Sequence, residues 1–339
     1  KDCNFIDCSY HPNSGRSNQG GSVYWHADDG ILCNCIFTNS YSKSEGGAIY
    51  WCGPRGSLSD CTFTNCRSRT YGGAIYLMGT NCTLLNSIFI EDSANYNGGA
   101  VEWYSGENGY MADCSFENCV AEYGGAIRFN GEGNVTNCNF TNNTATYGGG
   151  AVWIYSGTVS NCNFINNKAT GTDSWGGAIR MYSGTVSNCN FVNNSATGEG
   201  SWGGAIMFVN TCTVSNCNFA DNTATEDGGA VYVRGNDASF DDVDSLNNTA
   251  ARGGSSFIDG NNTRITNCDL DNNTATIRGG GLDVAGLNCV VINVTLSNCN
   301  ATQDGGAVYV RGSNVLFDNV TSVNNTAQRG GSSFIQGNN

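Results

Sequence analysis

The feature that most constrains the fold of this chain is a glycine pair that returns at a nearly constant spacing along the whole sequence. Each pair precedes a small residue and then, in most repeats, an aliphatic one, as in GGAI at Gly46 and GGAV at Gly98. The second glycines are residues 21, 47, 73, 99, 125, 150, 177, 204, 229, 254, 280, 306 and 331. Self-similarity at a fixed period of this length is typical of a solenoid, whose repeats contact only their neighbours. The sequence therefore predicts about thirteen stacked repeats of about 26 residues each.

The apolar residues inside a repeat alternate, which indicates β-strands rather than helices. After the glycine pair and its small residue the order is aliphatic, variable, apolar, as in Val101-Glu102-Trp103. Because the middle position accepts Glu, Arg and Asp, we expect it to face water while its neighbours face the core. Parallel strands joined by crossovers are almost always right-handed. The predicted fold is all-β: one right-handed parallel β-helix domain over residues 1–339, with rungs about 4.8 Å apart in a rod about 60 Å long.

A second block lies between the glycine pairs and reads Cys-x-Phe-x-x-Asn or Cys-x-Phe-x-x-Cys. Its phenylalanines are residues 5, 37, 63, 89, 116, 140, 164, 191 and 219. Stacked repeats place like residues on like, so we expect a phenylalanine column and hydrogen-bonded asparagine ladders. Ser245 and Ser322 interrupt the phenylalanine column, and Ser256 and Ser333 stand where an aliphatic residue is expected.

Eighteen cysteines are too many for a typical cytosolic protein. One repeat position is occupied by Cys114, Cys138, Cys162, Cys189 and Cys217. Parallel side chains on neighbouring rungs keep their Cβ atoms too far apart for unstrained disulfides. No CxxC or Cys-His pattern indicates zinc, so neither a metal nor another cofactor is expected. We expect a ladder of buried thiols, while disulfides around a corner remain an alternative for Cys3/Cys8, Cys61/Cys66 and Cys114/Cys119.

The formal net charge of −14 argues against nucleic acid as a partner, because phosphates require a basic surface. The sequence has no apolar run long enough for a transmembrane helix. Residues 227–262 return, slightly altered, at 304–339, which is an offset of three repeats. Since the sequence begins and ends in the middle of a repeat, we expect it to be part of a longer repeat array; end-to-end association of the coils into filaments is the alternative.

The two tetrapeptides GGA(I/V) and FxxN together resemble the repeat signature of the chlamydial polymorphic membrane proteins. With the abundant Asn, Thr and Cys, they are also similar to the adhesin-like proteins of methanogenic archaea. The resemblance covers the whole chain, and the GGSS repeats at Gly253 and Gly330 depart from it. It implies an extracellular β-helix on a cell surface, adhering to a glycan or protein of a host or neighbouring cell.

Aromatic residues precede the glycine pair in the central repeats, and we take them as the candidate binding site. Flat aromatic faces with charged neighbours suit sugar rings, which present an apolar face and a rim of hydroxyls. Trp175 and Trp202 follow insertions at 171–174 and 198–201, and lengthened loops of a solenoid often bind ligands. The predicted ligand-binding residues are Tyr123, Tyr147, Trp175, Trp202, Arg128 and Arg180. The alternative is a ladder of aromatic rings that only covers the corner and stiffens the stack.

An enzymatic role is the least favoured class. Asp173 and Glu199 would have to serve as the carboxylate pair of a glycosidase, but both lie in glycine-rich loops, which hold catalytic groups poorly. His11 and His26 are the only histidines, and both lie in the atypical first repeat. We therefore expect a non-enzymatic adhesin-like protein, with a structural filament or cell-envelope component as the main rival.

Overall fold

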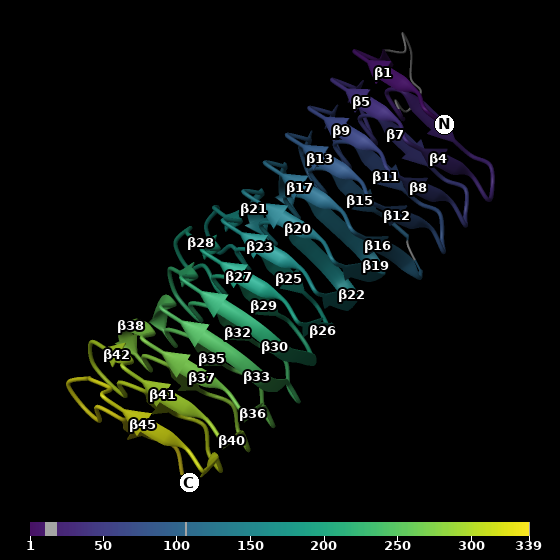
Figure 1. Cartoon of the computed structure of the whole chain (residues 1–339). Coiled ribbons are helices and arrows are strands. Elements are labelled where there is room, and N and C mark those ends of the chain that lie inside the picture. Colours follow the sequence, from purple (N-terminus) through teal and green to yellow (C-terminus); the bar gives the residue numbers. More distant parts are fainter. Residues whose placement is uncertain (11–18, 106, 339) are drawn as a thin grey trace. The chain divides into compact units, whose positions relative to one another are not determined.

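The computed structural model describes residues 1–10, 19–105 and 107–338, so His11 lies outside the described residues. The chain divides into two compact units, residues 1–168 (unit 1) and residues 169–339 (unit 2). Each unit is a coil of short parallel strands (Figure 1). No helix in the described ranges is long and apolar enough to cross a membrane.

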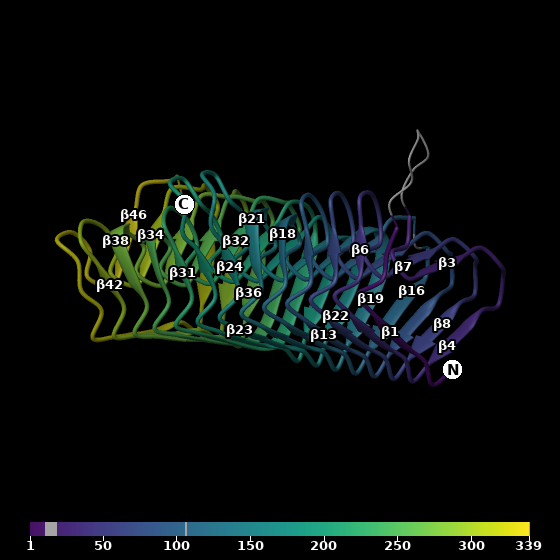
Figure 2. The same cartoon turned by 90° about the horizontal axis from the view of Figure 1, so that it is seen from above.

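Most turns of unit 1 contribute four strands, and strands of successive turns pair side by side in four columns (Figure 2). In two turns, one long strand spans the first and second columns. The first column holds β3 (Val23–Trp25), β7 (Ile49–Trp51), β11 (Ile75–Leu77), β15 (Val101–Trp103), and the starts of β19 (Ile127–Thr136) and β22 (Val152–Ser160). The second holds β4 (Ile31–Cys33), β8 (Ser57–Ser59), β12 (Thr83–Leu85), β16 (Gly109–Ala112), and the ends of β19 and β22. The third holds β1 (Asn4–Ile6), β5 (Ile36–Thr38), β9 (Thr62–Thr64), β13 (Ile88–Ile90), β17 (Ser115–Glu117), β20 (Asn139–Thr141) and β23 (Asn163–Ile165). The fourth holds β2 (Ser9–Tyr10), β6 (Tyr41–Ser42), β10 (Arg67–Ser68), β14 (Ser93–Ala94), β18 (Val120–Tyr123) and β21 (Thr144–Gly148); β24 (Lys168–Ala169) spans the unit boundary.

Unit 2 repeats the same four columns. The first holds β25 (Ile179–Met181), β29 (Ile206–Phe208), β32 (Val231–Val233), β35 (Ser256–Ile258), β39 (Leu282–Val284), β43 (Val308–Val310) and β46 (Ser333–Ile335). The second holds β26 (Gly184–Ser187), the starts of β30 (Cys212–Ala220) and β33 (Ser239–Leu246), then β36 (Arg264–Thr266), β40 (Val290–Ile292) and β44 (Leu316–Asp318). The third holds β27 (Asn190–Val192), the ends of β30 and β33, then β37 (Asp269–Asp271), β41 (Thr295–Ser297) and β45 (Thr321–Val323). The fourth holds β28 (Ser195–Ala196), β31 (Thr223–Ala224), β34 (Thr249–Arg252), β38 (Thr274–Arg278) and β42 (Asn300–Ala301).

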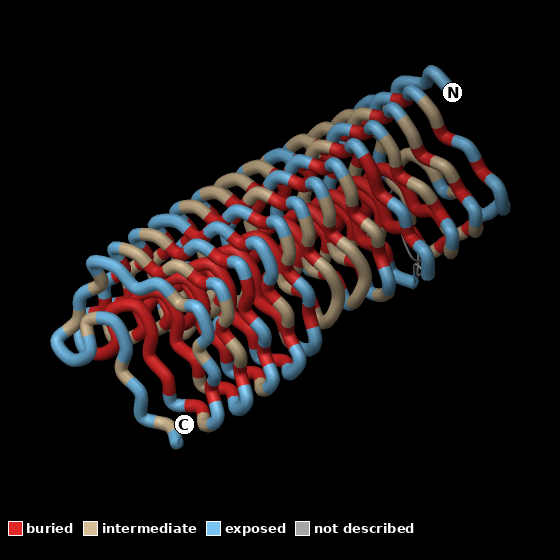
Figure 3. Tube along the Cα trace, turned by 60° about the horizontal axis from the view of Figure 1, so that its bottom comes forward, coloured by how far each residue is buried: buried red, intermediate tan, exposed pale blue. Residues whose placement is uncertain are grey.

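Like residues pair with like in these columns, as the repeat predicts. The rings of Phe116 and Phe140 stack with centroids 5.0 Å apart, and those of Phe191 and Phe219 with centroids 4.8 Å apart. These rings have no exposed surface. Buried residues recur in successive turns along each coil (Figure 3). The prediction of an all-β parallel solenoid is confirmed, with about 12 turns in the whole chain.

The asparagine ladder is also confirmed. Asn143 accepts a hydrogen bond from the backbone N–H of Cys119 at 2.9 Å and donates to the carbonyl of Phe116 at 3.1 Å. It also donates to Oδ1 of Asn167 on the next turn, at 3.0 Å. The preceding residue, Asn142, is exposed and has a φ of 57°, a conformation that asparagine adopts at low cost. Each Asn-Asn pair therefore combines an exposed left-handed corner with a buried ladder residue.

The prediction that the middle residue of the first strand faces water is wrong for most turns, although Tyr24 on β3 is 54% exposed. Tyr76 is 6% exposed and Glu102 has no exposed surface in unit 1, while Phe257 is 2% exposed in unit 2. These side chains do leave the inner core, but residues beside the glycine pairs fold over them. In unit 2, Trp175 and Trp202 pack against the cluster formed by Met207, Tyr232 and Phe257. A second apolar layer thus covers the outside of the first strand column.

Every cysteine is a free thiol, including both members of each corner pair named above. The five cysteines of the shared repeat position are buried. Their thiols point to the backbone two residues earlier; Cys138, for example, donates to the carbonyl of Thr136 at 3.1 Å. Burial raises the pKa of Cys61 to about 11 and that of Cys268 to about 12, which keeps both thiols protonated and unreactive at neutral pH.

Candidate ligand-binding surface

Aromatic side chains of unit 1 surround Arg128 on the outside of the first strand column. The rings of Tyr123 and Tyr147 lie 5.3 Å apart, and Tyr123 meets Trp153 edge to face at 4.7 Å. The guanidinium of Arg128 lies 5.8 Å from the centre of the Trp153 ring. Tyr155 follows Trp153 by two residues on β22 and so projects from the same side. Tyr104 follows Glu102, the carboxyl partner of Arg128, by two residues, and its ring stacks on Tyr76 with centroids 5.7 Å apart. We call Tyr104, Tyr123, Arg128, Tyr147, Trp153 and Tyr155 the tyrosine surface.

This surface is open to solvent beside an irregularity in the strand pairing. The pairing of β18 with β21 shifts by one residue, so Tyr123 lies opposite Gly148 instead of Tyr147. Tyr147 is 40% exposed, and Tyr155 on β22 is 50% exposed.

A buried carboxyl group holds Arg128 in place. Arg128 Nη1 donates to Oε1 of Glu102 at 2.8 Å, and Nη2 donates to Oδ1 of Asn130 at 3.2 Å. Glu102 has no exposed surface, and its Oε2 is buried without a hydrogen-bond partner among the described residues. Burial outweighs the attraction of Arg128 and raises the pKa of Glu102 to about 7. The charge of Arg128 is therefore only partly compensated at neutral pH.

The raised pKa predicts how stability depends on pH. Folded Glu102 binds its proton more tightly than the unfolded residue, so its contribution to stability falls as pH rises from about 4.5 to about 7. Glu102→Gln removes this titration. The quantity to compare is the free energy of unfolding of the variant minus that of the wild type. We expect this difference to be on the order of 3 kcal/mol more positive at pH 8 than at pH 4.5, because only the wild type loses stability over this range. Urea unfolding of the full chain at both pH values measures this, and a constant difference would contradict the burial argument.

In unit 2 the predicted site residues have a different environment. Trp175 and Trp202 are half-buried with ring centroids 6.5 Å apart, and Trp202 stacks on Tyr232 at 5.3 Å. Arg180 lies over the Trp175 ring at 4.5 Å. The indole N–H of Trp175 is buried and has no hydrogen-bond partner in the part of the chain that the structure describes. The two tryptophans thus contribute much of their surface to the outer apolar layer. This arrangement agrees with the alternative given above, a ladder of aromatic rings that covers the corner and stiffens the stack.

The structure therefore brings Tyr123, Tyr147 and Arg128 together in unit 1, and Trp175, Trp202 and Arg180 together in unit 2. The sequence reasoning missed Tyr104, Trp153 and Tyr155. The signal was available, since these residues follow the glycine pairs at the outward positions of the first strand. The incorrect assumption was that such positions hold only solvated side chains.

The carboxylates considered for catalysis lie in surface loops. The backbone N–H of Asp173 donates to the carbonyl of Glu199 at 2.8 Å, and both side chains are exposed. Neither residue is held by an ion pair among the described residues. The described ranges also contain no group of three or more His, Cys, Asp or Glu placed to hold a metal ion.

Comparison with known families agrees with the fold. Residues 1–168 and 88–210 match the right-handed β-helix region family, so more than half of the chain is covered. The chain belongs to this family of right-handed β-helices. Residues 216–234 in addition match the Chlamydia polymorphic membrane protein repeat, which confirms the resemblance seen in the tetrapeptides. No curated protein matches the chain.

Proposed function

We propose that this chain is the β-helical part of an extracellular, adhesin-like surface protein, and that the tyrosine surface of unit 1 binds a glycan of a host or neighbouring cell. The exposure of Tyr104, Tyr147 and Tyr155, at 44%, 40% and 50%, carries the proposal. Large aromatic faces left in water around a fixed guanidinium suit the apolar face and hydroxyl rim of a sugar. The match to the polymorphic membrane protein repeat supports display on a cell surface.

The charge of the sequence that contains this surface favours neutral sugars. Arg128 is the only Lys or Arg in the sequence from residue 71 to 167, whereas the same stretch contains eight Asp and Glu residues. Charge repulsion would therefore weaken the binding of sialylated or uronic acid glycans. We accordingly propose neutral hexose-containing glycans as ligands.

Unit 2 fits the role of a stalk. The large hydrophobic side chains exposed in its described residues are all aliphatic: Leu246, Leu287, Leu316, Val323 and Ile335. Trp175, Trp202, Tyr232 and Phe257 instead pack into the outer layer. Arg252 and Arg329 form ion pairs between turns, as between Arg252 and Asp227 at 2.6 Å. We also propose that the protein is not an enzyme, because the exposed loops of Asp173 and Glu199 do not fix a carboxylate pair.

A glycan array probed with the full chain tests this function. We expect binding to neutral glycans that weakens about tenfold when Tyr147→Ala and Tyr155→Ala are combined, because about 1–2 kcal/mol of ring stacking is lost. Tyr110→Ala is the matched control, since Tyr110 is 42% exposed in the same unit but lies on β16, outside the tyrosine surface.

Two outcomes would contradict the proposal. Equal loss of binding in Tyr110→Ala and in the double variant would show that binding does not depend on the tyrosine surface. Failure of the wild-type chain to bind any glycan would favour the rival function of a structural filament or cell-envelope component.

A further inference from the structure

One turn of unit 2 has serine at three positions where other turns have apolar residues. Ser245 on β33 pairs with Phe219 on one side and Leu270 on the other, within the phenylalanine column. Ser256 on β35 lies between Val231 and Leu282 in the aliphatic column. Ser255, just before it, takes the place of the alanine found in most other repeats. The exchange of a phenyl ring and an aliphatic side chain for hydroxymethyl groups leaves the inside of this turn underfilled.

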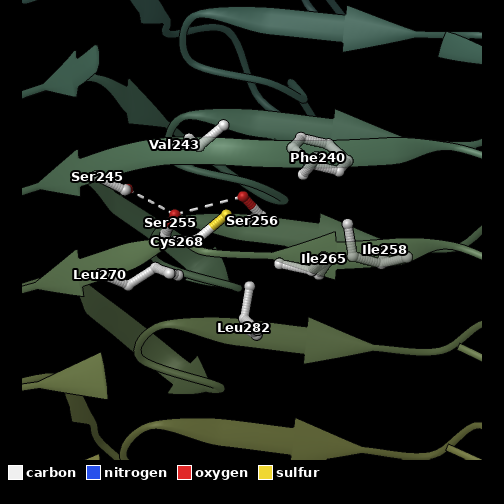
Figure 4. Close-up of a pocket in the computed structure, with 10 residues that line it drawn as sticks. All are labelled: Phe240, Val243, Ser245, Ser255, Ser256, Ile258, Ile265, Cys268, Leu270 and Leu282. Atoms are coloured by element: carbon white, nitrogen blue, oxygen red, sulfur yellow. Dashed lines mark hydrogen bonds between the residues drawn. The ribbon is translucent and has the colours of Figure 1, made fainter. Parts of the chain in front are cut away.

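The structure has a cavity at this turn, with room of about 20 Å³ for a water-sized sphere (Figure 4). The lining residues are Phe240, Val243, Ser245, Ser255, Ser256, Ile258, Ile265, Cys268, Leu270 and Leu282. All of them are buried, and Ser256 is the most exposed at 8%. A volume of roughly 10–15 Å³ on this measure is enough for one water molecule, provided that the water finds two or more polar partners.

The three hydroxyl groups form a chain of hydrogen bonds that ends in this cavity. Asn248 Nδ2 donates to Ser245 Oγ at 2.9 Å, and Ser245 Oγ donates to Ser255 Oγ at 2.6 Å. Ser255 Oγ and Ser256 Oγ are 3.3 Å apart, and this long contact is the one hydrogen bond that Ser256 Oγ makes among the described residues. A hydroxyl group has one donor and two acceptor sites. The Ser256 hydroxyl, the last in this series of hydrogen bonds, therefore has donor or acceptor sites that are not used. Leaving such sites unused in an apolar environment costs free energy.

We infer that the serine turn is an internal hydration site, in which one water molecule binds Ser256 Oγ and Ser255 Oγ. The cavity is large enough for this water, and the two hydroxyls supply the polar partners that it requires. The same hydrogen-bonded chain returns three repeats later. Asn325 Nδ2 donates to Ser322 Oγ at 2.9 Å, Ser322 and Ser332 Oγ lie 2.7 Å apart, and Ser332 and Ser333 Oγ lie 3.4 Å apart. The recurrence indicates that the three serines form a unit.

A crystal structure of the full chain, at a resolution that shows ordered water, tests this site. We expect one water peak within hydrogen-bonding distance of Ser256 Oγ, and a second crystal pressurised with xenon should keep that water. A cavity with no density, or one that takes up xenon, would overturn the inference because it would show that the cavity is dry.

The variant Ser256→Val is the second measurement, and it leaves the tyrosine surface unchanged. Valine is the residue at the paired position of β32, Val231, and the change removes the Ser256 hydroxyl. We therefore expect the water to disappear and the melting temperature to rise by about 2–4 °C. A variant that retains the water, or that melts at a lower temperature than the wild type, would contradict the site. Glycan binding in the same variant is expected to be unchanged, so this test is independent of the proposed function.

Discussion

Gly125→Ala is expected to have the largest effect on the stability of unit 1. Gly125 is the second glycine of its pair, and a Cβ atom there would overlap the carbonyl oxygen of Gly150 on the next turn and lie 2.6 Å from that of Thr144. Both are backbone atoms, so the overlap is relieved only if the two turns separate. We expect a loss of more than about 3 kcal/mol, at the upper end of what overpacking costs. Urea unfolding of the full chain, followed by circular dichroism, measures this loss.

Gly331→Ala is the matched control for this change. Gly331 is also the second glycine of its pair, but a Cβ atom there comes no closer than 3.0 Å to its nearest neighbour, the carbonyl oxygen of Asn325. We expect its free energy of unfolding to stay within about 1 kcal/mol of the wild type, because a small shift relieves the contact. Similar losses in both variants would show that the chain responds to any side chain at this repeat position and not to the close approach at Gly125.

Asn143→Ala is expected to have the second largest effect. The side chain bonds the backbone N–H of Cys119 and the carbonyl of Phe116, and both groups would remain buried without their partner. Each unsatisfied group costs about 1–3 kcal/mol, so we expect a total loss of about 3 kcal/mol. The measurement is again urea unfolding of the full chain.

The adjacent Asn142 supplies the comparison for the asparagine ladder. Asn142→Ala changes the same residue type in the same turn, but the side chain is exposed and only its left-handed backbone conformation is affected. The expected loss is about 1–2 kcal/mol. If Asn142→Ala were the more destabilising of the two variants, the corner conformation rather than the buried ladder would hold the turns together.

The sequence predicts the inner core well because each inner position repeats with the same residue type. The stacked rings of Phe140 and the close packing at Gly125 follow from a period that leaves one consistent alignment of the turns. The outer layer is harder to predict. The middle strand position holds Tyr76, Glu102 and Arg128 in successive turns, a pattern that also describes a solvated face. Only the conformation of the residues beside the glycine pairs decides whether that face is covered.

The candidate site shows the same limit. The residue types predicted a sugar-binding aromatic face, but they did not distinguish Tyr147, which is exposed beside a shift in strand register, from Trp202, which packs on Tyr232. The difference depends on the local register and on which rings the neighbouring turn presents. Neither is visible in a single repeat considered alone.

The serine turn also has a consequence for how the chain selects its alignment while it folds. In a coil whose turns are nearly alike, skipping one turn would preserve most apolar contacts, so misaligned coils would be close in energy to the native one. Asn248, whose side chain donates to Ser245 Oγ, also donates from its backbone N–H to Asn273 Oδ1 on the next turn, at 2.9 Å. If the turn of Asn273 were skipped, Cys299 would take its place and leave this buried N–H without an oxygen acceptor, at about 1–3 kcal/mol. The serine turn therefore favours the native neighbour over the next turn along the chain.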